Sequence, residues 1–179
     1  MIADPRVRLR AVAVQFASNM NNLSADRPAL SEADLERFMA VALEESRHAL
    51  PACLPNPPVG CVIVRDGVIV SRGFTGAPGM PHAEAAALRT LDAGHTPDPL
   101  TLFVTLEPCA FVGRTPSCAQ AIVASGIRSV FVGTLDPDVR NDGAGIEIMR
   151  RAGIDVRVGV LEGPVRAFIG QYLSSGQKA

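Results

Sequence analysis

The order of short apolar runs after residue 58 is the strongest constraint on the fold of this chain. Residues 59–64 are β-branched and apolar, Asp66-Gly67 is a typical hairpin turn, and residues 68–74 form a second apolar run. Beyond residue 100, apolar runs alternate with segments of helical periodicity. A hairpin followed by strand–helix–strand crossovers predicts an α/β domain, with a five-stranded, mixed but mostly parallel sheet and helices on both faces. The expected strands are 59–64, 68–74, 102–106, 130–133 and 154–160, and the expected helices are 31–50, 82–94, 119–124, 145–152 and 165–173.

The composition excludes several classes of protein. The 179 residues, 47% of them apolar, suffice for one domain with a hydrophobic core. Basic and acidic residues nearly balance at 17 and 18, and with no tryptophan the chain lacks the basic, aromatic surface of a nucleic-acid binder. No apolar run approaches the roughly 18 residues of a membrane span, and the N-terminal stretch lacks a secretory signal. We therefore expect a cytoplasmic protein, in which residues 1–30 are an extension of unknown role and residues 31–179 form the domain.

Three residues in the middle of the chain are the best candidates for chemistry. His82 opens a predicted helix, Cys109 follows the third predicted strand, and Cys118 stands at the start of the next helix. Because a domain of this size needs no disulfide framework, metal binding or catalysis is the better use for its cysteines. One imidazole and two thiolates are good zinc ligands, and a three-ligand set leaves the fourth tetrahedral position to water. The pKa of such a water falls toward neutrality.

Glu84 adds a base to this set. It follows His82 by two residues, and the first turn of a helix can direct both side chains into one cleft. A carboxylate beside a metal-activated water can accept its proton and pass it on. The four residues together predict hydrolytic attack on an electrophilic carbon.

Taken singly, these residues have simpler explanations. A histidine before a helix usually caps it or is exposed, and two cysteines nine positions apart are usually small buried hydrophobic residues. We expect Cys61 in the core, Cys53 in the core or at the surface, and His48 and His95 in solvent. Only the combined pattern of PHAE, a strand and LEPC favours a functional site.

The combined pattern resembles the zinc-dependent cytidine-deaminase superfamily, whose signature is H-x-E followed by P-C and a second cysteine. The eight-residue loop between the two cysteines is similar to the pyrimidine deaminase domain of riboflavin biosynthesis. Further similarities to that domain are PNPPVGCVIV (55–64), TLEPC (105–109), GRTPSC (113–118) and DPDVRNDGAGI (136–146). The resemblance covers about residues 35–160 and implies the three-layer α-β-α cytidine-deaminase-like fold. About twenty residues follow it, so we expect no fused reductase domain.

The resemblance also implies roles for individual residues. Zn²⁺ would be bound by His82, Cys109 and Cys118, with Glu84 as the proton shuttle, in a zinc-dependent deaminase domain over residues 31–179. The implied substrate-binding residues are Asn56, Ala83 and Arg114. The implied reaction uses a zinc-activated water to replace an exocyclic amine of an aminopyrimidine or related heterocycle by a carbonyl, with release of ammonia. The expected partners are this small molecule and a second copy of the chain in a homo-oligomer, most simply a dimer, but neither nucleic acid nor membrane.

The chain departs from the family pattern near the expected substrate. Thr75 stands where the family usually has a histidine, and Phe111 and Val112 stand where two histidines usually follow the first zinc cysteine. Those histidines are associated with the ribose-phosphate end of the substrate, and neither Phe nor Val can donate a hydrogen bond to a phosphate. Segment 136–142 adds Arg140 and two acids, which would alter the charge at the mouth of the site. The pathway is therefore riboflavin-type or a specialised one built on similar pyrimidines.

Two alternative functions fit the same residues. A free nucleobase or nucleoside deaminase, of cytosine or guanine type, would use the same chemistry on a different ring. A non-catalytic zinc-stabilised binding module would use the metal but not Glu84, because a structural site needs no carboxylate beside an open ligand position.

Overall fold

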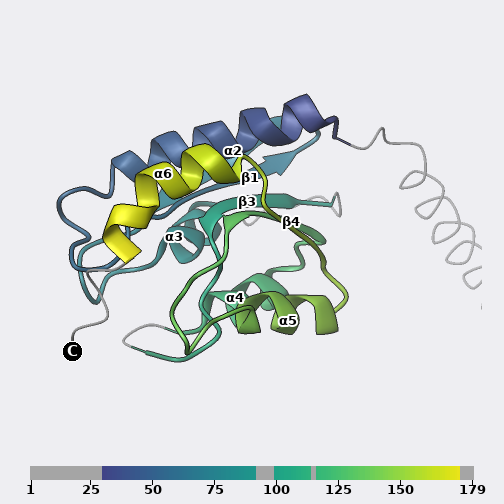
Figure 1. Ribbon diagram of the computed structural model, residues 1–179. Coiled ribbons are helices and arrows are strands. Elements are labelled where there is room, and N and C mark those ends of the chain that lie inside the picture. Colours follow the sequence, from purple (N-terminus) through teal and green to yellow (C-terminus); the bar gives the residue numbers. More distant parts are fainter. Residues whose placement is uncertain (1–29, 92–98, 114–115, 174–179) are drawn as a thin grey trace, which may run out of the picture. The chain divides into compact units, whose positions relative to one another are not determined.

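A hairpin and two strand–helix–strand crossovers build the sheet of this protein, as the order of apolar runs predicted (Figure 1). The computed structural model describes residues 30–91, 99–113 and 116–173. From Glu32 onward the described residues form one compact unit, and no helix among them is long and apolar enough to cross a membrane. In chain order the elements are α2 (Glu32–Arg47), β1 (Gly60–Arg65), β2 (Val68–Phe74), α3 (Ala83–Thr90), β3 (Thr101–Leu106), α4 (Cys118–Ser125), β4 (Ser129–Thr134), α5 (Ala144–Arg151), β5 (Asp155–Val158) and α6 (Glu162–Leu173).

The five strands lie in the order β2-β1-β3-β4-β5. Strand β1 pairs antiparallel with both of its neighbours, whereas β3 with β4 and β4 with β5 are parallel. Four strands therefore run in one direction and β1 alone runs against them, which confirms the predicted mixed, mostly parallel sheet.

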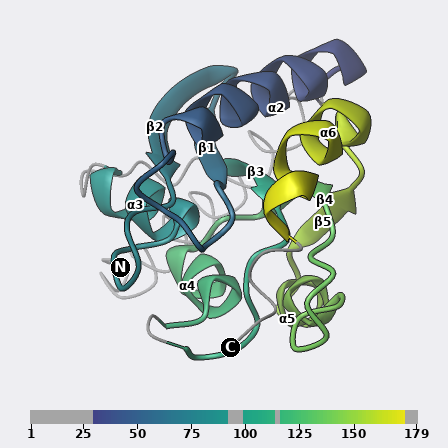
Figure 2. The ribbon, with the colours of Figure 1, turned by 60° about the vertical axis from the view of Figure 1, so that its left-hand side comes forward.

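Helices cover both faces of this sheet, as predicted. Helices α2 and α6 lie side by side on one face, and α4 and α5 lie on the other (Figures 1 and 2). Alternation along β2 assigns α3 to the face opposite α2. Arg72 pairs with Glu45 of α2, whereas the Ser71 hydroxyl donates to the carbonyl of Ala87 in α3. The α-β-α layering is thus complete.

The core between α2 and the sheet contains a row of aromatic rings. Phe103 of β3 is fully buried, and its ring centroid lies 5.3 Å from that of Phe38 in α2 and 4.9 Å from that of Phe131 in β4. Helix α2 ends at Arg47 rather than near Leu50, because the ring of Pro51 would clash with the carbonyl of a helical residue four positions earlier. The other predicted boundaries differ from those observed by a few residues, and residues 92–94 of the expected third helix lie outside the described residues.

One edge of the sheet collects the loops that carry the candidate chemistry. The carboxyl ends of β2, β3 and β4 and the amino end of β1 meet there, because β1 alone is reversed. Backbone hydrogen bonds hold these ends together, from Thr75 N to Val59 O (3.0 Å) and from Glu107 N to Thr134 O (3.0 Å). Ligand sites of open α/β sheets commonly lie beyond the carboxyl ends of the strands.

Candidate active site

His82 is held at the start of α3 by tight packing of that helix on β2. It is the N-cap residue, with extended backbone at φ −70° and ψ 167°. A Cβ atom at Gly73 of β2 would overlap the carbonyl oxygen of Ala83, so glycine is what allows this close approach. The first turn of α3, and with it the imidazole, is thereby fixed against the sheet edge.

The two cysteines are joined by the cap of α4. The Ser117 hydroxyl accepts from the amide of Gln120 (3.3 Å) and donates to the carbonyl of Cys109 (2.8 Å). The Cys118 amide in turn donates to the Cys109 sulfur (3.3 Å). Ser117 therefore caps the helix and sets the position of one cysteine relative to the other.

The cluster of His82, Cys109 and Cys118 fits a zinc ion. The Nδ1 atom of His82 lies 3.7 Å from the Cys109 sulfur and 3.4 Å from the Cys118 sulfur, and all three ligand atoms lie within 4.8 Å of one another. Tetrahedral zinc with its usual bond lengths separates nitrogen and sulfur ligands by roughly 3.5 to 3.8 Å. The structure thus brings together the three residues that the sequence singled out.

Glu84 lies buried beside this cluster, with 4% of its surface exposed. Burial raises the pKa of Glu84 to about 7, and its carboxyl interacts with the Cys118 thiol and with His82. The first turn of α3 therefore presents an imidazole and a carboxyl group to one place, although the two residues are only two positions apart in sequence.

The contact between the Cys109 and Cys118 thiols favours ionisation of Cys109. A hydrogen bond from Cys118, assisted by His82, lowers the pKa of Cys109 to about 4 against the opposing effect of burial. The same contact raises the pKa of Cys118, and the contact with Cys109 raises the pKa of His82. A thiolate is thus favoured at Cys109, as a soft metal ion requires.

Glu107 is a residue of the site that sequence reasoning missed. Its side chain is buried and accepts three backbone hydrogen bonds, one from Asp136 (3.3 Å), one from Gly143 (3.1 Å) and one from Gly145 (3.0 Å). At Gly145, a Cβ atom would overlap the carbonyl oxygen of Pro108, so the start of α5 packs directly on the segment that leads into Cys109. The acidic residue in an otherwise apolar TLEPC stretch was the available signal.

Other predicted site residues lie in different settings. Asn56 lies half-buried in the loop before β1, and its backbone amide donates to the carbonyl of Cys53 (2.9 Å). Ala83 is buried as the first residue of α3. Arg114 lies outside the described residues. Their assignment to substrate binding stays a prediction.

Of the other cysteines and histidines, the three that the structure describes are not part of the cluster. Cys53 and Cys61 are both buried, as expected for Cys61, and burial raises the pKa of each thiol. His48 has 58% of its side chain exposed, and its ring contacts Glu45 and Phe74. His95 lies outside the described residues.

The departures from the family pattern have structural consequences. The Thr75 hydroxyl accepts a hydrogen bond from the Val59 amide (3.2 Å), so it ties the end of β2 to the loop before β1. Val112 has 79% of its surface exposed. The guanidinium of Arg140 lies 4.6 Å above the ring of Phe111 and is paired with Asp138. The charge that Arg140 adds is therefore balanced within its own loop.

A largely apolar pocket of about 330 Å³ borders the cluster. Its lining contains His82 and Cys118 but not Glu84. The lining residues are Gly79, Pro81, His82, Ala85, Pro116, Cys118 and Ala121.

A three-layer α/β domain with a His/Cys/Cys cluster and a buried carboxyl group at one sheet edge is a deaminase-type zinc protein. Residues 32–134 match the cytidine and deoxycytidylate deaminase zinc-binding region, and the chain belongs to this family. Among its relatives, a diaminohydroxyphosphoribosylamino-pyrimidine deaminase of Buchnera aphidicola is 40% identical over 124 residues, which are 69% of this chain and 83% of that protein.

Larger relatives match the chain over part of their length. The riboflavin biosynthesis protein PYRD of Zea mays is 43% identical over 145 residues, covering 81% of this chain and 36% of the maize protein. The chain thus spans about a third of the length of such curated relatives. A solved structure from Thermotoga maritima, a diaminohydroxyphosphoribosylaminopyrimidine deaminase and 5-amino-6-(5-phosphoribosylamino)uracil reductase, superposes with a TM-score of 0.75 at 41% identity, over 80% of this chain and 41% of that one.

Proposed function

We propose that this protein is a hydrolytic deaminase of an aminopyrimidine, with zinc held by His82, Cys109 and Cys118. The single observation that carries the proposal is the buried carboxyl group of Glu84 next to these three ligand atoms. A structural zinc site is closed by a fourth protein ligand, and the described residues offer a group of three. Family membership and the names of the relatives support the same reaction class.

Each residue of the site has a task in this reaction. Zinc, when bound, supplies a Lewis acid that lowers the pKa of water toward neutrality. Glu84 accepts a proton from the attacking water, delivers it to a ring nitrogen, and then assists departure of the amine. The carbon that bore the amine becomes a carbonyl carbon, and ammonia leaves. Because Glu84 is buried, its proton transfers are shielded from bulk solvent.

The relatives' names support a diaminopyrimidine that carries a phosphoribosyl group, but two residues favour weaker recognition of its phosphate. Phe111 and Val112 offer no side-chain donor, and a charge-assisted hydrogen bond to phosphate contributes about 1.5–3 kcal/mol. We therefore expect the protein to bind the pyrimidine ring as its relatives do. We expect the 5′-phosphate to raise kcat/KM by less than about tenfold.

Ammonia release across matched substrates tests this proposal. The panel contains a diaminopyrimidine as base, riboside and 5′-phosphate, together with cytosine, cytidine and guanine. The proposal predicts turnover of the diaminopyrimidines, with a small effect of the phosphate. Exclusive turnover of cytosine, cytidine or guanine would favour the nucleobase or nucleoside alternative, and a phosphate effect well above tenfold would show that Phe111 and Val112 do not weaken phosphate recognition. Protein with Glu84→Gln serves as the blank for contaminating activity.

A further inference from the structure

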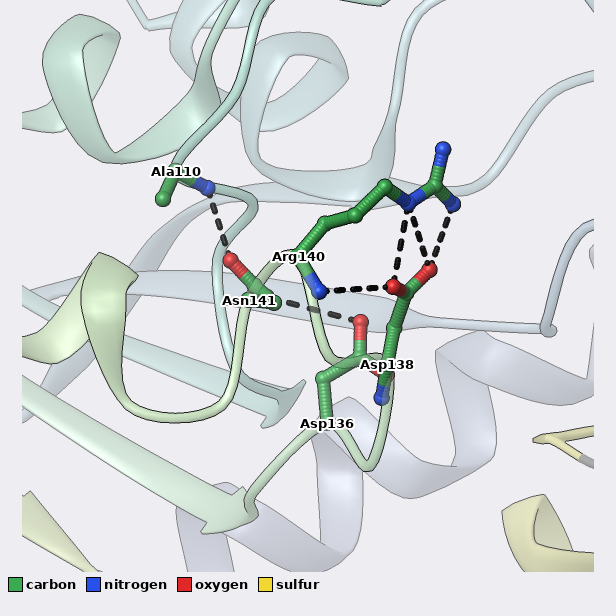
Figure 3. Close-up of polar contacts among 5 residues, drawn as sticks. All are labelled: Ala110, Asp136, Asp138, Arg140 and Asn141. Carbon is green, nitrogen blue, oxygen red and sulfur yellow. Dashed lines mark hydrogen bonds and ion pairs between the residues drawn. The ribbon is translucent and has the colours of Figure 1, made fainter.

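The segment that follows Cys109 is clamped by a loop that is distant in sequence, residues 136–141 (Figure 3). Asn141 provides the central contact, with only 2% of its surface exposed. Its Oδ1 atom accepts a hydrogen bond from the amide of Ala110 at 2.8 Å, and its Nδ2 atom donates to Asp136 at 3.4 Å. One buried side chain thus joins the loop to the residue next to a candidate zinc ligand.

A second contact holds the following residue. The guanidinium of Arg140 lies 4.6 Å from the centre of the Phe111 ring. The Nε atom of Arg140 donates to both carboxylate oxygens of Asp138 (Figure 3). Arg140 and Asp138 are exposed to solvent enough for this ion pair to contribute little by itself. The buried Asn141 contact is therefore the one on which the position of the segment depends.

The Ala110 amide needs an acceptor from outside its own segment. It shares a peptide group with the Cys109 carbonyl, which accepts from the Ser117 hydroxyl and the Ala119 amide, so Asn141 holds the opposite side of the same peptide plane. Ala110 is half-buried, and an amide there that loses its acceptor regains one by turning toward water, which shifts the backbone at the adjacent cysteine. Asn141 prevents that shift.

We infer that Asn141 is a positioning residue for the zinc site: it fixes the backbone at Cys109 through the Ala110 amide and so slows the loss of the metal. The inference rests on the proposed zinc site. Outer contacts of this kind are commonly worth 10- to 100-fold in metal affinity. The role belongs to the side-chain oxygen of Asn141, which no aliphatic residue of similar size can replace.

Zinc release into an excess of a chromogenic chelator tests the inference. The Asn141→Leu variant keeps the branched shape of the side chain and loses both hydrogen bonds, and we expect it to release zinc at least about tenfold faster than the wild type. The paired exchange of Asn141→Asp with Asp136→Asn keeps the net charge and both hydrogen bonds, with an oxygen at position 141 accepting from Ala110, and we expect it to recover most of the lost retention. Ser71→Ala is the matched control, because it also removes a buried side chain with two hydrogen bonds, to Ala87 and Thr90 at the far end of α3.

Thermal unfolding of the same proteins separates positioning from general stability. Ser71→Ala should lower the melting temperature without accelerating zinc release. The inference is overturned if Asn141→Leu releases zinc no faster than the wild type or the Ser71→Ala control, or if the paired exchange releases it as fast as Asn141→Leu. Wild-type protein that binds no zinc would instead contradict the proposed metal site itself.

Discussion

At the scale of the residue, Glu84 distinguishes the proposed catalytic site from a purely structural zinc site. Its carboxyl group is buried, and burial raises the pKa of that group. The carboxyl group interacts with the cluster, whereas a purely structural zinc site would have no use for it. Its position, two residues from His82, could be predicted from the H-A-E pattern because the first turn of a helix can direct both side chains into one cleft. The buried carboxyl group proposed as the base could thus be predicted from the sequence.

Replacement of Glu84 by glutamine should abolish turnover but not metal binding. The amide keeps the shape of the side chain and cannot shuttle a proton, so we expect kcat to fall by at least about 100-fold. Zinc content and the melting temperature should stay near those of the wild type, as measured by elemental analysis and calorimetry. Glu147→Gln, on the exposed face of α5, is the control and should leave all three unchanged. Full activity of the Glu84 variant would refute its role.

At the scale of the element, the start of α5 matters more than its sequence indicated. Gly143 and Gly145 donate their amides to Glu107, which lies 36 and 38 residues earlier in the chain. Periodicity and turn residues predicted the helix itself. They could not predict that Glu107 accepts hydrogen bonds from the amides at the start of α5, because that contact depends on how β3 and β4 are paired. The end of α2 is a different case, because Pro51 alone accounts for it. Full use of the steric effect of that proline would have placed the end of the helix correctly.

Substitution of Gly145 by alanine should destabilise the protein through this contact. The added methyl group would overlap the Pro108 carbonyl and crowd Glu107, so we expect a loss of about 2–3 kcal/mol in the free energy of unfolding and faster zinc release. Urea denaturation measures the first effect. Gly170→Ala in α6, where the new methyl group meets no atom within 4 Å, is the matched control and should be neutral or stabilising. Equal stability of the two variants would contradict the packing described for α5.

At the scale of the whole molecule, the fold brings residues that are distant in sequence to one edge of the sheet. His82 lies 27 residues before Cys109 and 36 before Cys118, yet their ligand atoms lie within 4.8 Å of one another. The reversal of β1 and the two parallel crossovers place their loops together. The layer order and the cluster of three candidate ligands could be predicted from the sequence, from the chemistry of the residues and from the resemblance to a family. The Asn141 clamp did not, because it stands in a segment that departs from that family.

The most direct test of the central claim is zinc K-edge X-ray absorption of the purified protein, combined with elemental analysis. The account predicts about one zinc per chain, with two sulfur neighbours at about 2.3 Å and two nitrogen or oxygen neighbours at about 2.0–2.1 Å, one of them water. The same shell should persist in Glu84→Gln. A third sulfur neighbour, or the outer-shell scattering of a second imidazole, would indicate a closed structural site, and protein prepared without chelators that contains no zinc would contradict the account outright.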